Sequence, residues 1–233
     1  MMKTLQELET NLESMRDQGY RRYQAALMPD IDKEAIIGIR VPVLRDLAKE
    51  MAGTPLADEF LNALPHKYYD ENNLHAYLIE RVAKDFDTAI RLTDAFLPYI
   101  DNWATCDTFS PRVFQKNLNR LYEKSVEWMQ SDHPFTVRYG IVVQLRYFLT
   151  KQFRPEMLDF MAQIHTDEYY VNMAIAWYYS YALIEQREAT IGYFLENKLD
   201  RWIHNKALQK AVESRRLEKE DKLYLAGLKR PKE

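Results

Sequence analysis

Ala174–Ile184, with the sequence AIAWYYSYALI, is the longest nearly unbroken apolar stretch of the chain. It is too short to cross a lipid bilayer, and its length and composition suit a helix packed in a protein core. The residues that open this stretch, Asn172–Ala176 (NMAIA), resemble the openings of two other apolar stretches, Val137–Ile141 (VRYGI) and Asn205–Gln209 (NKALQ). The sequence therefore predicts helices that recur along the chain.

The recurring stretches follow one another at a nearly constant distance. When Arg138, Met173 and Lys206 are aligned, the steps between them are 35 and 33 residues. Leu74–Leu78 (LHAYL) has a similar opening 63 residues before Val137, which leaves room for one more unit. A period in the thirties to forties is typical of two-helix repeats, whose units bury their apolar faces only by stacking. We therefore predict a curved solenoid whose second helices line a concave groove.

The hydrophobic pattern along the rest of the chain predicts an all-α fold, because alternation with a period of two is scarce. One amphipathic helix is expected over Thr4–Arg22, and another is expected to begin at Val41-Pro42 and end at Met51. No stretch rich in glycine, serine or proline divides the chain. Residues 1–233 are therefore predicted to form one domain.

The composition excludes several classes of site. The chain has six glycines in 233 residues and lacks the common glycine-rich phosphate loops. Its single cysteine, Cys106, excludes an internal disulfide and a cysteine-cluster zinc site. No metal, nucleotide or organic cofactor is expected, because the five histidines lack metal-ligand spacing: His66, His75, His133, His165 and His204.

The charge is uneven along the chain. The formal net charge is −3, yet residues 201–233 hold ten basic and five acidic residues, so residues 1–200 carry −8. Only a local basic patch can support binding to nucleic acid, and the acidic remainder would also suit a repeat protein that binds another protein. Residues 1–10 (MMKTLQELET) lack the apolar core of a secretion signal, so we expect a soluble cytoplasmic protein that is not bound to a membrane.

The segment Asp101–Asp107 (DNWATCD) holds the strongest candidates for a functional site. Trp103 and Asp107 are four residues apart, which places an indole and a carboxylate on one face of a helix. Arg138 follows Asp107 by 31 residues and Trp177 follows Arg138 by 39, about one repeat in each case. Equivalent positions of successive solenoid units lie on the same surface, so these four side chains are predicted to meet on the concave face.

Ordinary packing offers another interpretation of the same residues. A tryptophan in a helical protein most often belongs to the core, an aspartate near a helix end is often a cap, and Arg138 could pair with an acidic neighbour. Cys106 lies beside Asp107, but no histidine is near it in the sequence to activate a thiol. We expect Cys106 to be a small buried side chain.

Four segments resemble the AlkD-type DNA alkylation repair glycosylases, a family of all-α proteins built of HEAT-like repeats. They occur in the family's order and at compatible spacing over nearly the whole chain. Gly38–Arg45 (GIRVPVLR) is similar to G-I-x-x-P-x-x-R, Trp103–Asp107 to W-x-x-x-D, Arg138–Leu145 to R-x5-Q-L and Ala174–Trp177 to A-I-G-W. The resemblance implies a HEAT-like solenoid that grips duplex DNA on its concave face and removes N3- or N7-alkylated purines.

The resemblance also implies a role for each site residue. An alkylated purine is cationic and already a good leaving group, so Asp107 would stabilise the oxocarbenium-like sugar and position the attacking water. Trp103 and Trp177 would pack against the sugar–phosphate backbone and attract the positive charge, while Arg138 would bind a phosphate. Family members do not turn the base into a pocket. Tyr23 matches a tyrosine that borders the DNA in this family.

Basic residues near the C-terminus extend the predicted contact with double-stranded DNA. Lys206 and Lys210 are four residues apart on one helix face, and Arg215 follows them, although such a run also suits a solvated final helix. We expect the protein to act as a monomer, as capped solenoids commonly do.

Three positions depart from the family's pattern. Met173 and Ser180 stand where the DNA-cleaving relatives have a lysine and an arginine, and Asn102 replaces a second tryptophan. Each change removes a positive charge or a stacking surface, and some branches of the superfamily lack detectable glycosylase activity. The alternative to an enzyme is therefore a catalytically inactive helical-repeat module that binds DNA of unusual structure or a protein partner.

Overall fold

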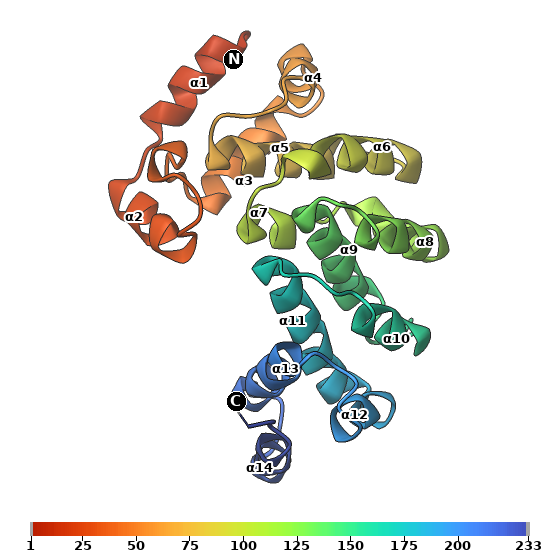
Figure 1. Cartoon of the computed structure of the whole chain (residues 1–233). Helices are drawn as coiled ribbons and strands as arrows, with labels where there is room; N and C mark the ends of the chain where they lie inside the picture. The colour runs from red at the N-terminus through yellow and green to blue at the C-terminus, as the bar shows by residue number, and fades with distance from the viewer. Residues whose placement is uncertain (1, 232–233) are drawn as a thin grey trace. The chain divides into compact units, whose positions relative to one another are not determined.

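The computed structural model describes residues 2–231, and within that range it contains fourteen α-helices and no strand (Figure 1). The predicted all-α fold class is confirmed. By its internal contacts the chain divides into two compact units, Met1–Leu118 and Asn119–Glu233. No helix of the described residues is both long enough and apolar enough to span a membrane.

The first unit is organised around α5, which packs against α3, α4, α6 and α7. Three short 3-10 helices complete the described part of this unit: η1 (Lys33–Ala35), η2 (Leu97–Tyr99) and η3 (Arg112–Lys116). Its α-helices are α1 (Leu5–Ser14), α2 (Gln18–Leu27), α3 (Val41–Met51), α4 (Pro55–Asn62), α5 (Tyr69–Val82), α6 (Phe86–Phe96) and α7 (Trp103–Thr108).

The prediction of one helix over Thr4–Arg22 is wrong, because the structure has two helices there. α1 ends at Ser14, and α2 begins at Gln18 behind the cap Asp17, whose Oδ1 accepts a hydrogen bond from the backbone N–H of Tyr20 at 2.9 Å. An N-cap aspartate starts a new helix without disturbing the apolar spacing, so periodicity alone did not reveal the break. The second predicted helix is confirmed as α3, which has a proline in its first turn.

A buried carboxylate fixes the chain that enters α3. Asp70 of α5 accepts hydrogen bonds from the backbone N–H groups of Ile37, Gly38 and Ile39 at 2.7, 3.1 and 2.7 Å. Gly38 has a φ of +90°, and a Cβ atom there would lie 2.6 Å from Cβ of Arg21, so this position requires glycine. Burial raises the pKa of Asp70, and the three N–H donors oppose that rise.

Two histidines, the buried His75 and the half-buried His66, form a pair inside the first unit. His66 Nε2 lies 2.7 Å from His75 Nδ1, and the two rings stack on Phe60 and Phe96 at centroid distances of 4.3 and 4.2 Å. Burial lowers the pKa of His66 to about 4 and, together with the neighbouring His66, lowers the pKa of His75 to about 2. Both rings are therefore neutral near pH 7, and the pair is part of the core.

The second unit alternates long and short helices. The long helix α11 packs against α9, α12 and α13, and α13 packs against α14. In Figure 1, α9, α11 and α13 follow one another, with α10 and α12 to one side of them. The helices of this unit are α8 (Leu118–Met129), α9 (Pro134–Tyr147), α10 (Glu156–Ala162), α11 (Tyr169–Glu185), α12 (Arg187–Leu195), α13 (Arg201–Glu213) and α14 (Lys219–Gly227).

The spacing of the long helices in the second unit agrees with the period read from the sequence. α9, α11 and α13 begin at Pro134, Tyr169 and Arg201, which are 35 and 32 residues apart. The helix pairs expected from the recurring apolar stretches are therefore present in this unit. The curved solenoid, its concave groove and the single domain over residues 1–233 stay predictions.

Candidate functional site

The short helix α7 presents two of the predicted site residues on its accessible face. It begins at Trp103 because Asn102 caps it, with Oδ1 accepting the backbone N–H of Thr105 at 2.8 Å. Thr105 and Cys106 face the core and are buried, whereas Trp103 and Asp107 are half-buried. Asp107 has an interaction partner in the structure and is reachable from solvent.

Two neighbours of this pair have structural roles. Asn102, where the resemblance described above implies a second tryptophan, is only 2% exposed and serves as the cap of α7. A tryptophan at this position would remove the side-chain acceptor that starts the helix. Cys106, the single cysteine of the chain, is fully buried, as expected, so it packs in the core.

The structure brings Trp103 and Tyr23 to the wall of one pocket, although 80 residues separate them. The pocket has a volume of about 210 Å³ and lies within the first unit. Tyr23 is 60% exposed and stacks on Tyr20 with ring centroids 6.1 Å apart. Further residues of the wall are Tyr20, Gln24, Leu27, Met28, Val41, Tyr69, Asn73, Tyr77, Ala104 and Thr108.

The pocket is aromatic and carries no ionisable acid or base other than its tyrosine hydroxyls. Five rings surround it, and their electron-rich faces attract cations. One of its polar groups is Gln24, which is 5% exposed and donates through Nε2 to the hydroxyl of Tyr69 at 3.2 Å. Gln24 Oε1 is buried without a hydrogen-bond partner among the described residues.

Sequence reasoning missed three of these rings. Tyr20 is three residues before Tyr23, a spacing that puts both on one helix face and would have found it. Tyr69 and Tyr77 lie on α5, and no sequence pattern reveals that α5 packs beside α7.

Within the segment that resembles the family's first motif, Arg45 supports this wall. It donates to Glu80 Oε2 at 3.0 Å and lies 4.0 Å from the Tyr77 ring centroid.

The other two predicted site residues lie in the second unit. Arg138 of α9 is 6% exposed and donates from Nη1 to the carbonyl oxygen of Tyr170 in α11 at 2.6 Å. Trp177 of α11 is half-buried, and its ring meets Tyr181 edge to face at 6.1 Å. By contrast, Trp128 of α8 is 3% exposed and belongs to the core.

Met173 and Ser180 of α11, which the sequence analysis found to differ from the pattern of the resembled family, have different surroundings. Ser180 is buried, and its hydroxyl donates to the carbonyl oxygen of Trp177 at 2.7 Å. An arginine at this position would have to bring its charge into the core or displace neighbours. Met173 is half-buried on the same helix. Trp103 and Asp107 thus belong to one unit and Arg138 and Trp177 to the other, and their meeting in one groove stays a prediction.

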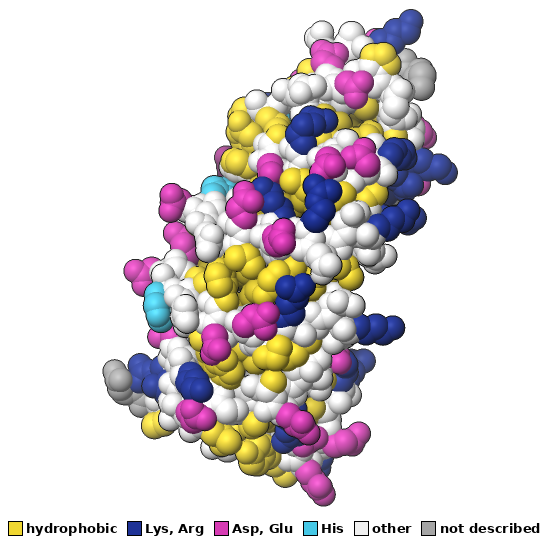
Figure 2. All heavy atoms as spheres, turned by 90° about the vertical axis from the view of Figure 1, so that its right-hand side faces the viewer, with side chains coloured by type: hydrophobic (Ala, Val, Ile, Leu, Met, Phe, Trp, Pro, Cys, Tyr) yellow, Lys and Arg dark blue, Asp and Glu magenta, His cyan; other side chains and the backbone are white. Residues whose placement is uncertain are grey.

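The predicted C-terminal DNA contacts are only partly exposed. Lys206 and Lys210 are half-buried on α13, and Arg215 is exposed just after that helix ends. The ammonium group of Lys206 lies 5.6 Å from the ring centroid of Trp202. On the face that Figure 2 shows, basic and acidic side chains are interspersed with hydrophobic ones, and neither charge sign dominates.

Comparison with models of protein families gives a match over most of the chain. The family model described as DNA alkylation repair enzyme matches residues 5–213. The match spans every helix except α14. A search of curated proteins found no match.

Proposed function

Because the chain belongs to the DNA alkylation repair enzyme family, we propose that it is a DNA glycosylase that excises cationic N3- or N7-alkylated purines from duplex DNA. The observation that carries the proposal is the accessible face of α7. It offers solvent an indole, Trp103, and a carboxylate, Asp107, one helical turn apart, while Thr105 and Cys106 between them are buried in the core.

The chemistry needs little more than a well-placed negative charge. The bond between sugar C1′ and the base nitrogen breaks, and its electron pair moves to the base, which leaves as a neutral molecule. The sugar is left as an oxocarbenium-like cation that a water molecule attacks at C1′, with loss of one proton. Asp107 would stabilise this cation electrostatically and orient the water, which can pass its proton to the carboxylate or to solvent.

The tryptophans contribute through their ring faces. Trp103 and Trp177 are half-buried, unlike Trp128, so part of each indole is available to a ligand. An aromatic face attracts a cation and packs against a sugar. The rings around Trp103, with Tyr23 the most exposed among them, would hold the DNA backbone and favour positive charge beside Asp107.

A second function is favoured by the state of Arg138. This side chain is proposed to hold a phosphate, yet it is buried and already donates to Tyr170. Together with buried Ser180 and Asn102, it favours a catalytically inactive module that binds DNA of unusual structure or a protein. If the protein is instead a glycosylase, Arg138 would position α11 and Trp177 rather than contact DNA.

A base-release assay separates the two functions. Purified protein is incubated with duplex DNA that contains 7-methylguanine, and free base and abasic sites are measured. We expect wild-type protein to release the base and Asp107→Asn to be at least tenfold slower, with binding to the same duplex within threefold of wild type. The matched control is Asp46→Asn, an exposed aspartate of α3, which should retain the wild-type rate.

Each outcome of the assay has a consequence. If wild-type protein binds the duplex but releases no base, the inactive binding module is the function. If Asp107→Asn is as fast as wild type, the carboxylate of α7 has no part in the reaction. If the control Asp46→Asn loses activity to the same extent, the effect is one of net charge and not of the site.

A further inference from the structure

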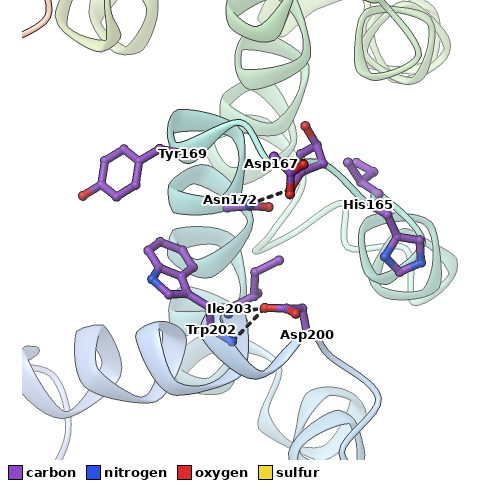
Figure 3. A pocket seen from close by; sticks show the side chains of 9 residues that line it. His165, Asp167, Tyr169, Asn172, Asp200, Trp202 and Ile203 are labelled. Carbon is purple, nitrogen blue, oxygen red and sulfur yellow. Dashed lines mark hydrogen bonds between the residues drawn. The ribbon is translucent and has the colours of Figure 1, made fainter. Parts of the chain in front are cut away.

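Trp202, the second residue of α13, stands between two depressions of the second unit's surface. It is 40% exposed and is the one residue shared by the linings of a depression of about 600 Å³ and a pocket of about 630 Å³. None of the site residues proposed for the glycosylase reaction lines the pocket of Figure 3.

The depression on one side of Trp202 is basic. Four cationic side chains line it together with the indole and two amides, and no carboxylate does. The cations are Arg201, Lys206, Lys229 and Arg230. A concave surface with this charge favours phosphate groups.

Specific hydrogen bonds hold the basic depression in shape. Asn205 of α13 donates from Nδ2 to the carbonyl oxygen of Arg230 at 2.9 Å and accepts the backbone N–H of Arg230 at 2.8 Å. The Arg230 guanidinium donates to the carbonyl oxygen of Leu199 at 3.0 Å. The backbone of Arg230 is thus fastened to α13, and its guanidinium is held beside the start of that helix.

The pocket on the other side of Trp202 has the opposite character. Asp167 and Asp200 line it with Asn172, and Asp200 also caps α13 by accepting the backbone N–H of Trp202 at 2.7 Å. In Figure 3 the rings of Tyr169 and Trp202 lie on one side of this pocket and His165 lies across it. Carboxylates repel phosphate but accept hydrogen bonds from amino groups, so a ligand with both groups has one favoured orientation.

Trp202 also has an aromatic neighbour and a cation. The ring of Tyr169, which is 55% exposed, meets the indole edge to face at 5.8 Å. Lys206, one turn after Trp202, lies 5.6 Å from the ring centroid. A cation beside an exposed ring is the arrangement with which proteins bind single-stranded nucleic acid, the ring stacking on a base and the cation holding its phosphate.

We infer that the Trp202 surface binds an unpaired nucleotide of DNA. The base stacks on the indole beside Tyr169 with its amino groups toward Asp167, and its phosphate occupies the basic depression. A paired base within a duplex has both faces covered by its neighbours, so the indole can reach only a base that has left the stack. The inference does not rest on the glycosylase reaction, because it uses none of the residues assigned to that chemistry. It shares only Lys206 with the DNA contacts predicted from the sequence.

A titration with matched DNA ligands tests the site. Fluorescence anisotropy measures binding of a blunt duplex of twelve base pairs, of the same duplex with a single-stranded end of four deoxycytidines, and of a single strand of twelve deoxycytidines, whose bases carry an amino group. Trp202→Ala should weaken binding of the single strand about tenfold and abolish any preference for the extended duplex over the blunt one. Its binding of the blunt duplex should stay within twofold of wild type.

Two further variants act as controls. Trp202→Phe keeps an aromatic face and should bind the single strand within about threefold of wild type. Tyr224→Ala removes an exposed ring of α14 that also has a cation beside it, Arg187 at 5.4 Å, but lines neither depression. It should bind like wild type.

The titration can overturn the inference in two ways. Equal binding of the single strand by Trp202→Ala and wild type would remove the indole from any DNA contact. Equal weakening by Tyr224→Ala and Trp202→Ala would mean that exposed aromatic rings contribute non-specifically. Circular dichroism of each variant verifies its fold, and partial exposure of Trp202 and Tyr224 makes folding defects small.

Discussion

The surroundings of Trp103 and Trp202 differ in charge, although both indoles line a pocket. Around Trp103 the wall consists of tyrosine rings, apolar or amide groups and Thr108, without a lysine or arginine. Around Trp202 four cationic side chains line one depression. Ring faces without a cation beside them attract positive charge. A ring beside cations suits a nucleotide, whose base stacks on the ring and whose phosphate contacts the cations. If both proposals hold, the same residue type serves opposite ligands, and its neighbours decide which.

The two surfaces also rest on different supports. Beneath the Trp103 pocket, α5 carries buried polar groups: Asp70 holds the turn before α3, and Asn73 accepts a hydrogen bond from Thr105 of α7 at 2.9 Å. The Trp202 surface is supported near the exterior by the hydrogen bonds between Asn205 and Arg230. We therefore expect substitutions beneath the first surface to change stability strongly and substitutions at the second to change mainly binding.

The largest effect is expected for Asp70→Ala. The substitution leaves three buried backbone N–H groups without an acceptor, and each such group costs about 1–3 kcal/mol, so the free energy of unfolding should fall by about 4 kcal/mol. Urea denaturation measures it. The matched control, Asp46→Ala on the exposed face of α3, should change the free energy by less than about 0.5 kcal/mol. A loss below about 1 kcal/mol for Asp70→Ala would show that the turn does not depend on this carboxylate.

The next effect is a loss of stability in mild acid. In the unfolded chain a histidine binds a proton near pH 6.5, whereas burial lowers the folded-state pKa of His66 to about 4. Below pH 6.5 the unfolded chain therefore binds more protons, and stability falls as the pH falls toward 4. At about 1.4 kcal/mol per pKa unit, His66 alone accounts for roughly 3 kcal/mol over this window.

Urea denaturation at pH 7 and pH 5 measures this dependence. The double variant His66→Leu/His75→Leu should lose most of the difference between the two pH values. His165→Gln, which changes an exposed histidine of the second unit, should keep it. An unchanged pH dependence in the double variant would assign the acid sensitivity to groups other than this pair.

Two glycines with the same backbone conformation offer a finer test of the turn that Asp70 holds. Gly38 and Gly53 have φ values of +90° and +83°, but only at Gly38 would a Cβ atom collide, 2.6 Å from Arg21. Gly53→Ala should cost about 1 kcal/mol for the left-handed conformation, and Gly38→Ala should cost about 2 kcal/mol or more. Equal losses in thermal or urea unfolding would mean that the chain around Arg21 moves aside.

Sequence reasoning succeeded where a pattern is local. The fold class, α3 and the period of the long helices in the second unit follow from apolar spacing, which depends only on neighbouring turns. The helix face shared by the half-buried Trp103 and Asp107 follows from their four-residue separation. The break between α1 and α2 was not predicted, because a single capping residue, Asp17, starts α2 without changing the apolar spacing.

The walls of both tryptophan surfaces could not be predicted in this way. Tyr69 reaches Trp103 because α5 packs beside α7, and Arg230 reaches Trp202 because a hydrogen-bonded pair fastens the segment after α14 to α13. Such contacts join residues on either side of an intervening helix, and no periodic pattern in the sequence reveals them. The burial of Arg138 has the same origin, since its partner Tyr170 lies 32 residues further on.

The smallest effect concerns how Lys206 contributes to DNA binding. If it contacts one phosphate, Lys206→Gln should weaken binding only about threefold at moderate salt. It should also make the slope of log K against log salt concentration shallower by about 1, because one fewer counterion is released. Lys219→Gln, which changes an exposed lysine at the start of α14, should leave the slope unchanged. If Lys206 instead serves only to cover the Trp202 ring, the slope will match wild type while the affinity for single-stranded DNA changes. That result would keep the indole as the recognition element and move the phosphate contact to the other cations of the basic depression.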